Sequence, residues 1–123
     1  MTQEDRQILL KDLSSRLPYG VRYRRFAWDD KQGEECISAK IYSISPDGYV
    51  RNYHEDESDY IDNVRPYLFP LSSITKKRLE ELSEYIDIKN AYVAVDLLNS
   101  HHIDYRGLIE KGLAIDATGL GIY

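Results

Sequence analysis

The chain has 123 residues, enough for one domain with a sizeable hydrophobic core, and its formal net charge of -5 disfavours a globally basic nucleic-acid-binding protein. No stretch approaches the roughly 20 apolar residues of a membrane span, and the single cysteine, Cys36, has no partner for an internal disulfide. The N-terminus is polar and acidic, unlike a signal peptide, so we expect a cytoplasmic single-domain protein (1–123) without membrane association.

Residues 1–17 predict an amphipathic helix over 3–16. Thr2 followed by Asp5 resembles a capping box with aspartate in place of the usual Glu or Gln. Leu9, Leu13 and Leu17 fall on one face at helical spacing, and Pro18 then ends the pattern. We expect this face to cover a sheet.

Residues 18–70 predict a β part, because short segments rich in β-branched and aromatic residues alternate with turn signals. The expected strands are 21–28, 36–44, 49–53 and a fourth from Tyr60, with an acidic, solvated loop over 54–59. Arg65–Pro70 is expected to be an edge strand, because proline cannot donate to an interior ladder. Short connections predict an antiparallel meander, either a small curled sheet or an SH3-like barrel.

Residues 71–116 predict a helical part and 117–123 a frayed, glycine-rich tail. Helical spacing predicts a helix over 76–86, and 91–100 is interpreted as a helix although 92–95 also fits a strand. Asp104 is expected to cap a last short helix over 105–111. The fold class is therefore α+β: an N-terminal helix, a curled antiparallel sheet, then two or three C-terminal helices. The predicted core comprises Leu9, Leu13, Leu17, Ile37, Ile41, Val64, Leu68, Leu79, Leu82, Leu98, Leu108 and Ile109.

Two basic patches are candidate binding surfaces. One lies on the sheet, where arginines are interleaved with some of the 11 tyrosines, and the other at the start of the 76–86 helix, where cations oppose the helix dipole. The candidate residues are Arg22, Arg24, Tyr49, Arg51, Lys76, Lys77 and Arg78. The alternative is that the arginines pair with the acidic run between Glu55 and Asp62, which would neutralise a patch.

The sequence contains only weak indications of a metal-binding or catalytic site. His101, His102 and Asp104 are weak metal-ligand candidates, because no second His or Cys cluster completes a coordination sphere. We therefore expect no cofactor and no resident metal. The favoured function is a non-catalytic interaction or regulatory module with a protein partner or a second copy of itself. A small metal-dependent enzyme and a nucleic-acid-binding accessory protein are the alternatives.

The segment Leu98–Ala114, containing His-His-Ile-Asp-Tyr-Arg-Gly-Leu-Ile-Glu-Lys-Gly-Leu-Ala, resembles a family of short uncharacterised proteins of gut-bacterial, prophage and phage genomes. Three further pieces carry the same resemblance: 10–13 with 16–21, 64–73 and 121–123. The resemblance implies a phage or mobile-element setting and supplies no catalytic residue. Lys76-Lys77-Arg78 departs from it, since related sequences usually begin this helix with acids.

Overall fold

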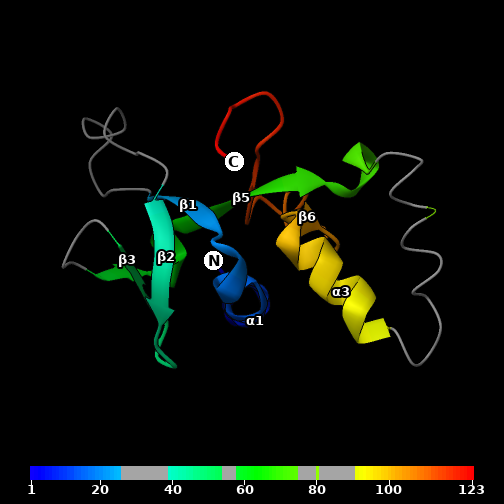
Figure 1. The fold of residues 1–123 in the computed structure, drawn as a ribbon. Helices are drawn as coiled ribbons and strands as arrows, with labels where there is room; N and C mark the ends of the chain where they lie inside the picture. The colour runs from blue at the N-terminus through cyan, green and yellow to red at the C-terminus, as the bar shows by residue number, and fades with distance from the viewer. Residues whose placement is uncertain (26–38, 54–57, 75–79, 81–90) are drawn as a thin grey trace.

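The computed structural model describes residues 1–25, 39–53, 58–74, 80 and 91–123, and Figure 1 shows their arrangement. Two helices and seven strands position the features discussed below. They are α1 (Gln3–Arg16), β1 (Arg22–Arg25), β2 (Ala39–Ile44), β3 (Tyr49–Asn52), β4 (Ser58–Tyr60), β5 (Val64–Pro70), α3 (Ala91–Ser100), β6 (Ile103–Asp104) and β7 (Ile115–Asp116). Short 3₁₀ turns occur at Leu17–Tyr19, Ile61–Asn63 and Leu71–Ser73.

Helix α1 confirms the N-terminal prediction, including its cap. The Asp5 backbone N–H donates to Thr2 Oγ1 at 3.1 Å, and the Thr2 backbone N–H donates to Asp5 Oδ2 at 3.3 Å. This reciprocal pair satisfies two backbone donors at the helix start. Leu9 and Leu13 are fully buried against the sheet, as the apolar spacing predicts. Gly20, at a φ of 70°, lets the chain turn from the helix into β1.

The described strands form one open, mixed sheet in the order β4-β3-β2-β1-β5-β6, with β7 also paired to β5. Strands β1 to β4 and the β1–β5 pair are antiparallel, as predicted. The sheet does not close, so the barrel alternative is wrong. In Figure 1, β5 crosses from the β1 side of the molecule to the β6 side, and α1 lies between β2 and α3.

The prediction that β5 is an edge strand is wrong. It pairs with β1 over its first residues and with β7 and β6, in parallel, over its last four. Pro66 and Pro70 lack a backbone N–H, so each removes one hydrogen-bond donor from the strand. The other backbone groups of β5 still pair with neighbouring strands. Phe69 N–H donates to His102 O at 2.8 Å, and Leu68 O accepts from Ala117 N–H at 2.8 Å. A strand with two prolines therefore pairs with three other strands.

The C-terminal region also differs from the prediction. Helix α3 confirms the helical interpretation of 91–100, but 105–111 is a turn and not a helix. Both oxygens of Asp104 accept backbone hydrogen bonds, from Leu108 and Ile109, each at 2.9 Å. The predicted cap is present, yet Gly107 and Gly112 adopt positive φ values and the chain folds back to form β7. The part expected to be helical therefore contains two strands.

The tail is ordered by contacts with the sheet. Ala117 is buried, and the hydroxyl of Tyr123 donates to Tyr67 O at 2.8 Å. The prediction of a frayed tail is therefore wrong. The glycine-rich sequence indicates a flexible segment, but the side chain of Tyr123 attaches it to the sheet.

The core lies between α1, the inner side of the sheet and the turn around Leu108. Of the predicted core residues, Leu9, Leu13, Ile41, Val64, Leu68 and Leu108 are buried, whereas Leu17, Leu98 and Ile109 are partly buried. Ile37, Leu79 and Leu82 lie outside the described residues, as does the predicted 76–86 helix apart from residue 80. Within the described part of the chain, no helix is long and apolar enough to cross a membrane.

Candidate functional site

The side of β2, β3 and β4 that faces away from the core carries polar and aromatic side chains. In β3, Val50 and Asn52 are buried while Tyr49 and Arg51 are exposed, because successive strand residues point to opposite sides. We call this side the outer face. It comprises Lys40, Tyr42 and Ser43 of β2, Tyr49 and Arg51 of β3 with the following Tyr53, and Ser58 and Tyr60 of β4.

A β-bulge in β2 shapes this face. The pairing register shifts between Ile41, which lies opposite Asn52, and Ser43, which lies opposite Arg51. Without the shift, Ser43 would follow Ile41 to the buried side. The bulge instead leaves Tyr42 exposed and places Ser43 beside Arg51. The sequence contains no turn or glycine signal for this bulge, so Ser43 was not predicted as a site residue.

The outer face is organised in rows across the strands. Ser43 and Ser58 flank Arg51 in the middle row, and Arg51 Nε donates to Ser58 Oγ at 3.4 Å. On one side of this row, Tyr49 lies opposite Tyr60 with ring centroids 5.3 Å apart. The middle row is thus a guanidinium between two hydroxyls, with aromatic rings beside it.

On the other side of the middle row, Tyr42 and Tyr53 pack edge to face with ring centroids 5.2 Å apart. The Nζ atom of Lys40 lies 5.3 Å from the Tyr53 ring centroid, within range of a cation–π interaction. The exposed fractions of Tyr42, Tyr49 and Tyr53 are 55%, 44% and 61%. These three rings therefore present aromatic surface to solvent on one side of the sheet.

The surface is hollowed over the middle row. The hollow has a volume of about 400 Å³ and is lined by Ser43, Ser45, Asp47, Tyr49, Arg51 and Ser58. A volume of this size falls within the range of small-ligand sites. Asp47 accepts a hydrogen bond from Ser45 Oγ, and Ser45 Oγ also accepts from Tyr49 N–H at 3.1 Å. The carboxylate at the rim is thus part of the β2–β3 turn.

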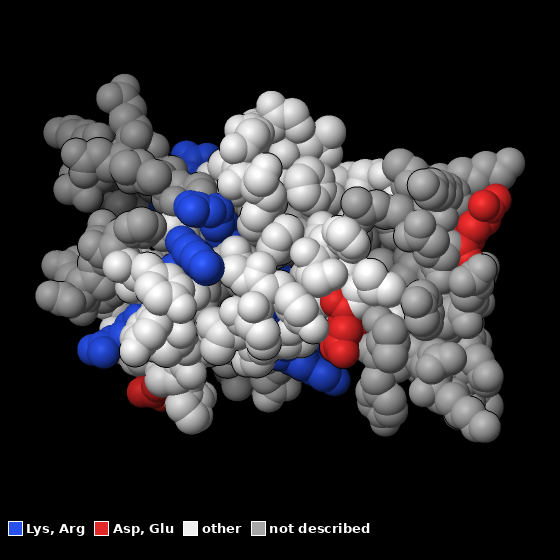
Figure 2. Space-filling view, in the orientation of Figure 1, with Lys and Arg blue, Asp and Glu red and all other residues white. Residues whose placement is uncertain are grey.

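The structure brings only some of the predicted binding residues to this hollow. Tyr49 and Arg51 line it. Arg22 and Arg24 flank the buried Tyr23 in β1 and so point to the same side of the sheet, with Arg22 opposite Lys40. Figure 2 shows Lys and Arg side chains gathered over β1 and β2. The second patch, Lys76, Lys77 and Arg78, lies outside the described residues.

Two acidic residues of the run between Glu55 and Asp62 form ion pairs with arginines other than Arg51. Asp59 is buried, its Oδ2 accepts from Tyr23 OH at 2.6 Å, and its Oδ1 lies 2.5 Å from Arg25 Nε. Burial, together with the hydrogen bond to Asp59, raises the pKa of the Tyr23 phenol. Asp62 pairs with Arg6, which lowers the pKa of Asp62. The prediction that residue 59 belongs to a solvated loop is wrong, and neither carboxylate pairs with Arg51.

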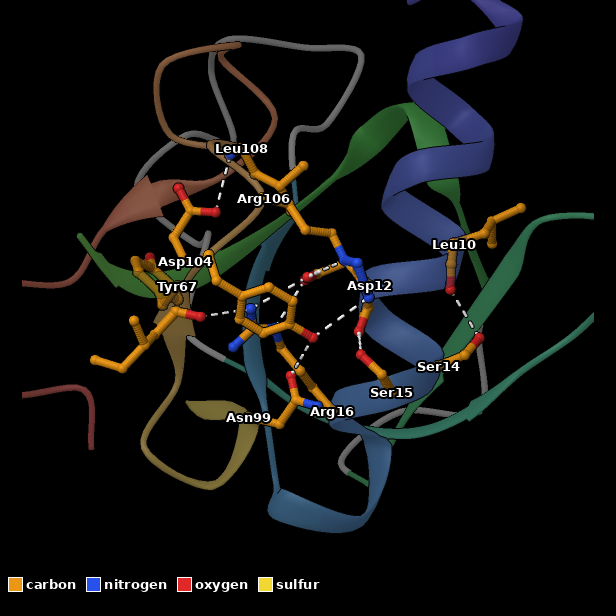
Figure 3. Close-up of polar contacts among 12 residues, drawn as sticks. Leu10, Asp12, Ser14, Ser15, Arg16, Tyr67, Asn99, Asp104, Arg106 and Leu108 are labelled. Atoms are coloured by element: carbon orange, nitrogen blue, oxygen red, sulfur yellow. Dashed lines mark hydrogen bonds and ion pairs between the residues drawn. The ribbon is translucent and has the colours of Figure 1, made fainter. Parts of the chain in front are cut away.

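A second polar cluster joins α1 to residues 99–106 and is shown in Figure 3. Asp12 and Arg16 are fully buried, and Asp12 Oδ1 also accepts from Arg106 Nε at 3.1 Å. Arg16 Nη2 donates to the backbone oxygen of Ile103 at 2.6 Å. The guanidinium carbon atoms of Arg16 and Arg106 lie 5.1 and 4.8 Å from the Tyr105 ring centroid, within range of a cation–π interaction. This cluster ties α1 to β6, and the full burial of Asp12 and Arg16 makes it a structural element.

The weak metal-ligand candidates do not converge. His101 is exposed, His102 stacks on Tyr123 with ring centroids 3.6 Å apart, and both oxygens of Asp104 hold the following turn. Burial and the nearby charges of Arg16 and His101 lower the pKa of His102 to about 4. Among the described residues, no group of three or more His, Cys, Asp or Glu side chains is placed to hold a metal ion.

Fold and site together define an α+β protein with an open mixed sheet and a tyrosine- and arginine-bearing outer face. Comparisons of the chain with protein-family models, curated proteins and solved structures find no match.

Proposed function

We propose that the protein is a non-catalytic binding module and that it binds its partner through the outer face. The observation that carries the proposal is the exposure of Tyr42, Tyr49 and Tyr53 on one side of the sheet, beside Arg51 and Lys40. Exposed tyrosine and arginine are the side chains enriched at binding hot spots, because each offers a large contact area and a polar group.

The hydrogen bonding of the hollow favours binding over catalysis. The Ser45 hydroxyl donates to the carboxylate of Asp47. The two residues are only two positions apart in a tight turn, so this is a turn contact and not the contact of a serine nucleophile with its base. The Ser45 hydroxyl is committed to that turn through Tyr49 N–H. Arg51 and the two serines beside it are donors suited to holding an anionic group.

Two features of the sequence support a proposal for the cellular setting of this module. Its resemblance to short phage and prophage proteins supports a role in a mobile element, and its composition supports a cytoplasmic location. In such a setting, a small binding protein acts by occupying a surface of a larger molecule.

Site-specific photo-crosslinking in cells that encode the protein tests the proposal. A photo-reactive phenylalanine analogue replaces Tyr53 on the outer face or, as the matched control, Val95 on α3, which is 40% exposed. We expect a discrete adduct from position 53 and none from position 95. Equal adduct yields at both positions, or none at position 53, would contradict the proposal.

A further inference from the structure

We propose that the ligand of the outer face is single-stranded nucleic acid, an inference that rests on the function proposed above. The outer face places a cation between two aromatic rows along the strand direction. Tyr49 and Tyr60 form one row and Arg51 the next, and the third contains Tyr53 with Lys40 over its ring and Tyr42 packed against it.

The spacing of these rows follows from strand geometry. Tyr49, Arg51 and Tyr53 are successive outward residues along one chain segment, and alternate residues of a strand repeat every 6.5 to 7 Å or so. A single-stranded nucleic acid carries bases and phosphates on every nucleotide. The outer face therefore offers, in succession along β3, a ring, a cation and a ring, the groups that stack on bases and pair with a phosphate.

The middle row is suited to a phosphate. Arg51 presents a guanidinium, the side chain whose planar donors match phosphate oxygens, and Ser43 and Ser58 place hydroxyl donors on either side of it. The hollow of about 400 Å³ above this row gives the phosphate and its sugar room to enter. Asp47, the one carboxylate among the described residues that line the hollow, lies at the hairpin end and is bonded to Ser45.

The flanking rows are suited to bases. Base stacking on aromatic side chains needs accessible ring surface, and Tyr42, Tyr49 and Tyr53 expose about half of their surface. Duplex DNA buries its bases against each other, so exposed rings favour an unpaired strand. An acidic protein surface would also match the cations and pack on the rings, and it is the alternative outcome that the experiments below distinguish.

Charge complementarity supports the same ligand. The chain carries a net charge of -5, yet Arg22, Arg24, Lys40 and Arg51 share the outward side of the sheet. Two carboxylates near this sheet, Asp59 and Asp62, pair with arginines elsewhere and do not neutralise Arg51. Local positive charge in an acidic protein attracts phosphates to that face.

Fluorescence anisotropy with labelled DNA and RNA strands of about 12 nucleotides, and with the matching duplexes, tests the inference. Titrations at about 50 and 200 mM salt measure the dependence of affinity on counterion release. We expect wild-type protein to bind single strands more tightly than duplexes, with weaker binding at the higher salt. No binding at the lower salt, or tighter binding to duplex, would overturn the inference.

Variants separate the contribution of base stacking from that of phosphate contacts. Tyr53→Ser should weaken binding about tenfold or more through lost stacking, with an unchanged salt slope. Arg51→Ala should weaken binding and reduce the salt slope by about 0.7, the value for one phosphate on a single strand. Lys111→Ala, an exposed cation outside the sheet, is the control and should bind as wild type. An equal loss in all three variants would indicate nonspecific attraction and contradict the site.

Failure of this inference is distinguishable from failure of the proposed function. If no oligonucleotide binds but position 53 forms a protease-sensitive adduct in cells, the face is a binding surface and the ligand is a protein. If position 53 forms no adduct and no oligonucleotide binds, both proposals fail. Circular dichroism melting of each variant confirms that a loss of binding is not a loss of folding.

Discussion

Arg16 Nε lies 2.8 Å from Asp12 Oδ2, one helical turn away, and neither side chain is exposed to solvent. Arg16 Nη2 donates to both Asp12 Oδ1 and the backbone of Ile103, which joins α1 to β6. A buried ion pair gains little net stability over apolar packing, but loss of one partner leaves a buried charge. This pair therefore makes the attachment of the C-terminal region specific.

The first prediction concerns that pair. Asp12→Ala should lower the free energy of unfolding by about 3 to 5 kcal/mol, because it leaves two buried or partly buried arginines without their shared carboxylate. The double variant Asp12→Leu, Arg16→Met should lose less than Asp12→Ala alone. Urea denaturation of the three proteins measures both values, and a loss below about 1 kcal/mol in Asp12→Ala would contradict the structural role.

The hydrophobic core gives a second prediction. Leu13→Ala should lower the free energy of unfolding by about 2 to 5 kcal/mol, because Leu13 is fully buried between α1 and the sheet. Leu71→Ala is the control, since Leu71 is 53% exposed and its truncation should change stability by about 0.5 kcal/mol or less. Similar effects at both positions in chemical denaturation would show that α1 does not pack as described.

The sequence predicts α1 completely and the antiparallel strands approximately, because capping and alternation are local signals. It does not predict the parallel pairing of β5, since the contacts between Phe69 and His102 join residues far apart in the chain. The same limit applies to Asp59, whose burial depends on Tyr23 and Arg25 in a distant strand. Asp59 was predicted to lie in a loop because it is charged and belongs to an acidic run.

The candidate site was predictable in part. Tyr49 and Arg51 were found because alternation places them together on one side of a strand. Ser43 depends on a bulge and Ser58 on the extent of β4, and neither has a local sequence signal. Residues that complete a site across strands are thus found only once register is known.

A third prediction concerns the hydroxyl of Tyr123. It accepts from Arg22 N–H at 2.8 Å and donates to Tyr67 O at 2.8 Å, bridging β1 and β5 beyond their last paired residues. Tyr123→Phe removes only this oxygen and should lower the free energy of unfolding by about 1 to 3 kcal/mol. Tyr42→Phe removes an exposed hydroxyl and should be neutral in the same denaturation assay. Equal, negligible effects would show that the bridge does not hold the tail.

The fourth prediction concerns pH. The pKa of His102 is lowered to about 4 in the folded protein, below the value of about 6.5 for an unfolded chain. Between these values the unfolded chain binds a proton that the folded protein does not, so stability should fall as pH decreases from about 6.5 to 4. Stability above pH 7 is unaffected by this group.

Urea denaturation at about pH 7 and pH 4.5 measures this effect. His102→Asn is the control, because asparagine lacks the titrating group and tolerates the positive φ of 60° at this position. We expect the variant to lose less stability than the wild type over this interval. The same loss in both proteins would assign the pH dependence to other groups.

The central claim is that the outer face of β2, β3 and β4 binds single-stranded nucleic acid, and NMR chemical-shift mapping tests it most directly. A single-stranded oligonucleotide is titrated into isotopically labelled protein at low salt. We predict that the shifts concentrate on the amides of Tyr42, Ser43, Arg51 and Tyr53 and leave those of Val95 and Asp96 on α3 unchanged. Shifts concentrated on α3, or none on β2 and β3 at saturating oligonucleotide, would contradict it.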